Sequence, residues 1–177
     1  MNYSIPVRNK FINPFKIILV IIISRYMYYY TNTISEWHFI DNVNLIFHEA
    51  GHIVFIMFGD LIRTLGGGLM QIIIPSVFSF YFFKNKNNFS ASLLLFWLGQ
   101  NLLNISVYAG DAINMDLPLL GGDNVYHDWN HLLSSINMLN YTEQIASFLY
   151  ITGIVIFIIA FIYSTRYSIS DNYLSKY

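Results

Sequence analysis

Five long apolar stretches constrain the fold of this chain more than any other feature. They cover residues 17–30, 43–58, 69–83, 93–109 and 145–164. Charged residues make up only 11% of the sequence, whereas soluble domains carry about 25%. So few charged side chains cannot cover the surface of a soluble globule. We therefore expect an all-α integral membrane protein with a single domain over residues 1–177, solvated in large part by lipid.

Composition also excludes several classes of protein. The formal net charge is -1 and lysine and arginine form no cluster, so we expect no nucleic-acid partner. The chain has no cysteine, which rules out a disulfide framework, a thiolate metal site and a cysteine nucleophile. No small-residue cleavage site follows the first apolar stretch, so we interpret it as an uncleaved anchor with interfacial tyrosines.

The third apolar stretch decides how many times the chain crosses the membrane. Residues 69–83 form a short stretch with Pro75 in its middle, and it follows Gly66, Gly67 and Gly68. Glycine and proline both interrupt helices. We therefore expect a short re-entrant or hairpin element here, after the helix of residues 43–58, and four to five transmembrane helices in all.

The positions of the basic residues favour four crossings. If residues 69–83 do not cross, every lysine and arginine outside the first stretch falls on one side of the membrane. Basic residues gather on the cytoplasmic side. This arrangement puts residues 1–16 and the tail of residues 165–177 in the cytoplasm. It also puts residues 110–143 on the outer side, where the second stretch begins.

The second stretch contains the residues that carry chemistry. His48, Glu49 and His52 form an H-E-x-x-H pattern, and about 0.002 matches would arise by chance in a chain of this composition. Residues i and i+4 of a helix share one face, so the two imidazoles can bind one zinc ion. Glu49 can act as general base toward a zinc-activated water. Ionisable groups are costly within a membrane, so they indicate function, although a structural histidine pair is the alternative.

A catalytic zinc ion has three protein ligands, and the third must come from another segment. The candidates lie between residues 110 and 143, on the same predicted side of the membrane as His48. Asp128 and His127 are the preferred alternatives, at the predicted start of a short helix, and one of them could orient the other ligand. Asp111 is a weaker candidate. The remaining candidates are interpreted as turn or surface residues: Asp116, Asp123 and His131.

The motif in a membrane helix resembles the site-2 protease family of intramembrane zinc metallopeptidases. In that family a glycine-rich hairpin follows the motif helix, as residues 59–68 would here. A helix with small and amide residues comes next and is similar to residues 97–104. A Leu-Pro-rich loop then ends in the third ligand, which the resemblance assigns to Asp128. The chain departs from the family because Trp129 replaces the glycine expected after Asp128.

The resemblance implies hydrolysis of peptide bonds in or near membrane segments. Gln100, Asn101 and Asn104 could hold an extended substrate backbone, or they could simply hydrogen-bond between helices. Two alternatives to a protease stay open. The chain could be a non-proteolytic zinc transporter or sensor, or a structural membrane protein that keeps a relic site.

Overall fold

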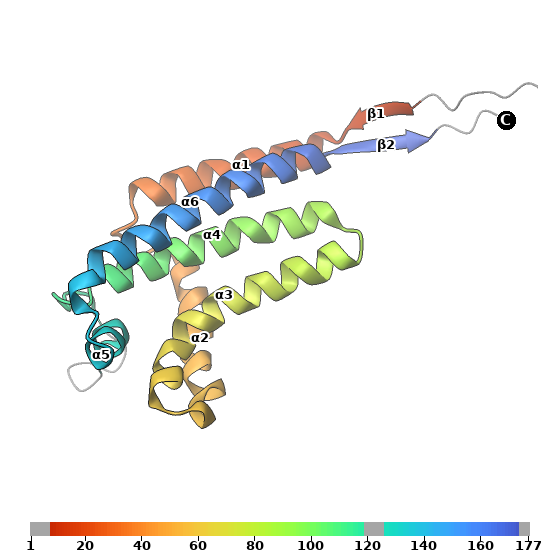
Figure 1. Cartoon of the computed structure of the whole chain (residues 1–177). Helices are drawn as coiled ribbons and strands as arrows, with labels where there is room; N and C mark the ends of the chain where they lie inside the picture. Colours follow the sequence, from red (N-terminus) through yellow and green to blue (C-terminus); the bar gives the residue numbers. More distant parts are fainter. Residues whose placement is uncertain (1–7, 119–125, 174–177) are drawn as a thin grey trace, which may run out of the picture.

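The computed structural model describes residues 8–118 and 126–173, and helices dominate it (Figure 1). Six α-helices follow one another along the chain: α1 (Pro14–Asn32), α2 (Phe39–Val54), α3 (Asp60–Lys84), α4 (Asn88–Gly110), α5 (Asp128–Ser135) and α6 (Thr142–Tyr167). Two 3-10 turns, η1 (Ile56–Phe58) and η3 (Leu139–Tyr141), precede α3 and α6. The predicted helical character is thus confirmed. The sequence did not predict a short ribbon formed by β1 (Arg8–Ile12) and β2 (Ile169–Tyr173).

Close contact between α4 and α6 forms the centre of the bundle. Gly99 on α4 faces Phe157 on α6, and a Cβ atom at Gly99 would lie 2.5 Å from the Phe157 ring. A Cβ atom at Gly153 on α6 would lie 2.9 Å from the carbonyl oxygen of Gly99. Small residues let helix backbones approach closely, which is how helices associate where lipid surrounds them. Leu103 fills the same interface and is fully buried.

Within the described residues, three helical segments are long and apolar enough to span a membrane: α3, α4 and the segment Leu139–Tyr167 that contains α6. The 16 residues of α2 extend only about 24 Å, less than the hydrocarbon core of about 30 Å. The predicted crossing by residues 43–58 is therefore not supported by the length of α2. The helix α1 is not among these three segments. Its mean hydropathy is lowered by Lys16, Arg25 and several tyrosines.

The predicted interruption after the motif helix is wrong, because α3 is one continuous helix of 25 residues that contains Gly66, Gly67, Gly68 and Pro75. The glycines serve packing instead. A Cβ atom at Gly51 on α2 would collide with the carbonyl oxygen of Gly66 on α3. The two backbones therefore touch, and the contacts between α2 and α3 offset the low helix propensity of glycine.

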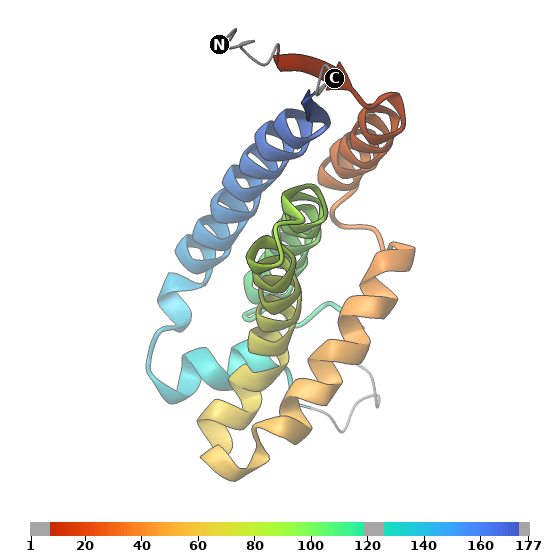
Figure 2. The same ribbon diagram turned by 90° about the vertical axis from the view of Figure 1, so that its right-hand side faces the viewer.

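The two ends of the described chain lie together. β1 pairs with β2 in antiparallel register, with Arg8 opposite Tyr173. The amide of Asn13 donates to the carbonyl of Ser168 at 3.0 Å, and the Lys16 ammonium lies 4.8 Å from the centre of the Phe89 ring. The starts of α1 and α4 and the end of α6 are therefore neighbours. We call this the ribbon end; α5 lies at the opposite end of the molecule (Figures 1 and 2).

Candidate metal centre

The motif residues lie on one helix, α2, as the pattern predicts. His48 is buried, His52 is half-buried and Glu49 is exposed. The His48 and His52 rings are one turn apart, with 4.8 Å between their centres. At the start of α2 the Asp41 carboxylate accepts the amide proton of His38 at 2.8 Å, which stabilises the helix terminus.

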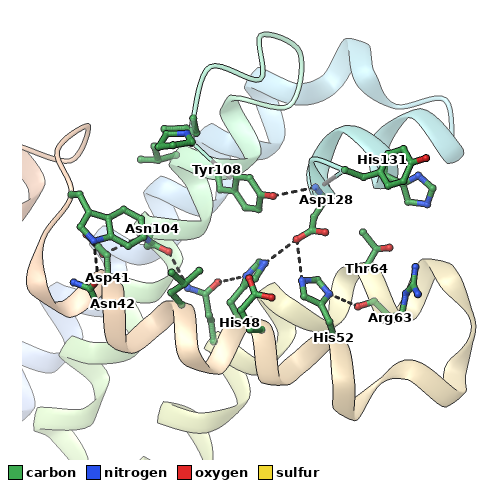
Figure 3. Close-up of a pocket in the computed structure, with 18 of the residues that line it drawn as sticks. Asp41, Asn42, His48, His52, Arg63, Thr64, Asn104, Tyr108, Asp128 and His131 are labelled. Carbon is green, nitrogen blue, oxygen red and sulfur yellow. Dashed lines mark hydrogen bonds and ion pairs between the residues drawn. The ribbon is translucent and has the colours of Figure 1, made fainter. Parts of the chain in front are cut away.

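Asp128 joins the two histidines from the start of α5 (Figure 3). Its Oδ2 atom lies 2.8 Å from Nε2 of His48 and 3.2 Å from Nε2 of His52. The Tyr108 hydroxyl on α4 accepts the amide proton of Asp128 at 3.1 Å and so fixes where α5 begins. Burial opposes ionisation of Asp128, but hydrogen bonds from His48 and His52 outweigh it and lower its pKa to about 2. These three residues offer ligand atoms that all lie within 4.8 Å of one another.

His127 is adjacent in sequence but faces away from this group. Its Nδ1 atom accepts the amide proton of Asn130 at 3.2 Å and caps α5. Nδ1 therefore carries no proton, and Nε2 donates to Oδ2 of Asp111 at 3.2 Å. Because both ring nitrogens have partners, the structure brings Asp128 rather than His127 to the two histidines. Burial lowers the pKa of His127, although Asp111 opposes that effect.

The other candidate ligands also lie outside the group. Asp111 ends α4 and organises the loop after it: its carboxylate accepts the amides of Asp116 at 2.9 Å and Leu117 at 3.0 Å. Asp116 is exposed and lies in the loop after α4. His131 contacts Asp60 on α3 at 2.7 Å near the surface. Asp123 lies outside the described residues.

The three amide residues of α4 have different positions. Asn104 lines the cavity beside the histidines, and its Oδ1 atom accepts from Gln71 at 2.9 Å. Gln100 is fully buried and hydrogen-bonds to Asn44 and Asp41 on α2. Asn101 is also buried, and its amide donates to the carbonyl of Trp97 on its own helix. Only Asn104 is therefore positioned to touch a substrate in this cavity.

Contacts behind the two imidazoles hold the rings in place. Nδ1 of His52 donates to the carbonyl of Arg63 at 2.9 Å, which leaves Nε2 directed at Asp128. Nδ1 of His48 lies 3.1 Å from Oε1 of Gln71 on α3. Gly67, one turn before Gln71, packs directly against the His48 ring, where a Cβ atom would lie 2.5 Å from Cε1. Both histidines therefore present the same nitrogen to the same point.

A cavity of about 1140 Å³ opens beside the histidines. Its polar lining includes Glu49, Asn104, Tyr108 and Asp128. Its apolar lining includes Ile34, Trp37, Leu45, Ile53, Ile56, Val107 and Pro118. The cavity thus has both polar and apolar lining, and the general-base candidate Glu49 lines it together with His48, His52 and Asp128.

Sequence reasoning missed Gln71, Tyr108, Gly67 and the carbonyl of Arg63. The glycine triplet did carry a signal, since three small residues in an apolar segment indicate close helix packing as well as a turn. Tyr108 is one of 14 tyrosines in the chain, and nothing local distinguishes it. Gln71 had no recognisable pattern, because its role depends on which face of α3 meets α2.

Comparisons with models of protein families, with curated proteins and with solved structures find no match to this chain.

Proposed function

We propose that the protein is an intramembrane zinc metalloprotease that resembles the site-2 protease family. The observation that carries the proposal is the convergence of Asp128, 80 residues away in sequence, on the two histidines of an H-E-x-x-H motif. Such a constellation beside a large cavity suits metal-assisted hydrolysis.

The donor set fits a zinc ion. Two imidazole nitrogens and one carboxylate oxygen are common ligands of catalytic zinc, with a fourth position left open. A tetrahedral ion with bonds of about 2.1 Å holds its ligand atoms about 3.4 Å apart. The separations from Oδ2 of Asp128 are 2.8 Å to His48 and 3.2 Å to His52. They would need to widen by about 0.6 and 0.2 Å to reach that spacing. When bound, zinc would acidify water and polarise the carbonyl group of a substrate.

Glu49 and Tyr108 complete the proposed chemistry. Glu49 is exposed to the cavity, where its carboxylate accepts a proton from the attacking water and returns it to the leaving amine. The Tyr108 hydroxyl accepts one hydrogen bond from the Asp128 amide, so its own proton is available to the cavity. That proton can stabilise negative charge on the oxygen of a scissile carbonyl group.

The proposed substrate is a membrane segment that has become locally extended. A helical backbone hides its carbonyl groups in hydrogen bonds, so the segment must unwind before it is cut. The cavity supports this proposal because it combines apolar side chains, which suit a membrane segment, with the amide of Asn104, which can bind a peptide group.

The ribbon supports a proposed arrangement in the membrane. Three crossings by α3, α4 and α6 alone would leave the two chain ends on opposite sides, yet β1 pairs with β2. We therefore propose a fourth crossing before α3, by α1, which is the helix that begins at the ribbon end. In this arrangement the basic residues at the ends of α1, α3 and α6 share that end: Lys16, Lys84, Lys86 and Arg166. We therefore assign the ribbon end to the cytoplasm and the metal centre to the outer half.

Substitution of Glu49 by glutamine tests the proposal. The protein is reconstituted in vesicles with a pool of single-span peptides, and new peptide termini are identified by mass spectrometry. We expect Glu49→Gln to keep its zinc and to lose cleavage by about 10²–10⁴-fold, since the general base is gone. Glu143→Gln, on the exposed first turn of α6, is the matched control and should cleave like the wild type.

Two results would contradict the proposal. One is cleavage by Glu49→Gln at the wild-type rate. The other is zinc flux across the vesicle membrane that survives Glu49→Gln while no peptide is cut, which would identify a transporter.

A further inference from the structure

A buried network of side chains lies behind the metal centre, and Asp41 is its centre. Asp41 is 2% exposed. Its Oδ1 atom accepts hydrogen bonds from the Tyr30 hydroxyl at 3.0 Å, from Gln100 Nε2 at 2.9 Å and from Asn104 Nδ2 at 3.1 Å. Its Oδ2 atom accepts the amide of His38 at 2.8 Å. Four donors converge on this carboxylate, so it acts as an acceptor at every contact.

The acceptor role of Asp41 sets the direction of a chain of hydrogen bonds that ends at His48. Because Asn104 turns its amino group to Asp41, its Oδ1 atom faces Gln71 and accepts from Nε2 at 2.9 Å. Gln71 has therefore used its amino group, and its Oε1 atom faces Nδ1 of His48 at 3.1 Å. An oxygen at that place requires a donor, so Nδ1 of His48 carries a proton. A metal ion bound at Nε2 would replace the second proton, which Nε2 donates to Asp128.

A second branch of the network has the same direction and is fixed at both ends. The Trp97 indole N–H, which can only donate, bonds to Oδ1 of Asn44 at 3.0 Å. Asn44 then donates to Gln100 Oε1 at 2.7 Å, and Gln100 donates to Asp41. Each amide in both branches thus donates toward Asp41. The side-chain amides of Asn104 and Gln71 therefore point their amino groups toward Asp41, as do those of Asn44 and Gln100 in the branch that begins at the Trp97 indole.

We propose that Asp41 is a positioning residue that acts through Asn104 and Gln71 to hold the proton of His48 on Nδ1 and to keep Nε2 available for a metal ion. This inference rests on metal binding in the proposed function, but not on proteolysis. The equivalent role for His52 belongs to the Arg63 carbonyl, which can only accept. His48 needs a longer chain because its Nδ1 faces a side-chain amide, and an amide can present either an oxygen or an amino group.

Two simpler roles for Asp41 do not account for its contacts. A role as the cap of α2 uses only Oδ2, through the His38 amide, and leaves the three contacts of Oδ1 unexplained. A role as a cation ligand conflicts with the four donors that already face the carboxylate. The geometry therefore fits a fixed acceptor that orients its neighbours.

Two substitutions with nearly unchanged side-chain volume test the proposal. Gln71→Met removes the acceptor at Nδ1 of His48. Asp41→Asn places an amino group among four hydrogen-bond donors. This favours rotation of the Asn104 and Gln71 amides, which would turn an amino group toward Nδ1 of His48. We expect each variant to weaken zinc binding by about 10–100-fold, the usual effect of losing a partner behind a metal-bound histidine. Asn44→Leu is the matched control: it breaks the Trp97 branch in the same buried region but leaves the His48 branch intact.

The measurements are zinc dissociation constants by chelator competition and ¹⁵N–¹H spectra of the histidine rings in zinc-loaded protein in micelles. In the wild type and in Asn44→Leu we expect His48 to show a slowly exchanging proton on Nδ1. That proton signal should disappear or exchange rapidly in Gln71→Met. The wild-type spectrum alone is a test that needs no variant, since zinc on Nδ1 of His48 would overturn the proposal.

Wild-type zinc affinity together with an unchanged His48 Nδ1 proton in Gln71→Met and Asp41→Asn would also overturn it. In that case the metal centre itself would stand, because the wild type would still bind zinc. A wild type that binds no zinc would overturn both this inference and the proposed function.

Discussion

Replacement of Gly67 by alanine gives a sharp test of how α3 shapes the metal centre. The added Cβ atom would lie 2.5 Å from Cε1, 2.6 Å from Nε2 and 2.7 Å from Nδ1 of His48. Non-bonded carbon atoms pack at about 3.5–4.0 Å, so the ring must retreat by about 1 Å. The only other relief is separation of α2 from α3, which would break the close contact between Gly51 and Gly66.

Metal–ligand distances tolerate deviations of only about 0.2 Å, so a displacement of 1 Å removes His48 from the ligand set. We expect Gly67→Ala to raise the zinc dissociation constant at least about tenfold, equivalent to about 1.4 kcal/mol. The assay is chelator competition on purified protein in micelles, with helix content checked by circular dichroism.

Gly68→Ala is the matched control for this prediction. It lies one residue further along the same helix, and its Cβ atom would meet Ile105 at 3.9 Å, an ordinary contact. We expect normal zinc affinity and a gain in helix stability of up to about 1 kcal/mol from the better propensity of alanine. Equal zinc affinity for Gly67→Ala and Gly68→Ala would refute the claim that the His48 ring can take its position only if residue 67 has no side chain.

Three further predictions concern the supports of the site. Tyr108→Phe leaves the Asp128 amide without its acceptor, so we expect a loss of about 1–3 kcal/mol in the free energy of unfolding and slower cleavage, measured by thermal melting and peptide assay. Gly51→Ala forces α2 away from α3 and should lower the melting temperature, because an added methyl group in a tight contact costs about 1–3 kcal/mol; an unchanged melting temperature would contradict the close contact. Asp60→Asn weakens two exposed ion pairs, with His131 and with Arg63, and should leave both melting temperature and zinc affinity unchanged.

The metal centre was predictable to the extent that helical periodicity determines it. The spacing of His48 and His52 predicted that both side chains lie on one face of one helix. The structure confirms this, with both rings on the same side of α2. The position of Asp128 at the start of a short helix was also predicted from local sequence and is confirmed. The family resemblance favoured Asp128 over His127, but local sequence left the choice open. It depends on long-range contacts, since the Asn130 amide and Asp111 occupy the two nitrogens of His127.

Long-range packing accounts for the predictions that were wrong or absent. The glycines at positions 66–68 have low helix propensity, yet they lie within α3 because α2 packs against them. Residues 43–58 are apolar enough to indicate a crossing, but the helix ends at Val54. The pairing of β1 with β2 joins segments more than 150 residues apart, and no local pattern in either segment specifies it.

The most direct test of the account is the zinc content of purified protein for wild type, Asp128→Ala and His127→Ala, measured by elemental analysis. His127→Ala removes an adjacent imidazole whose nitrogens face Asn130 and Asp111, so it is the matched control. We predict one zinc ion per chain in the wild type and in His127→Ala, and a loss of zinc in Asp128→Ala. Zinc retained by Asp128→Ala but lost from His127→Ala would contradict the proposed ligand set, and a wild type without stoichiometric zinc would contradict the metal centre altogether.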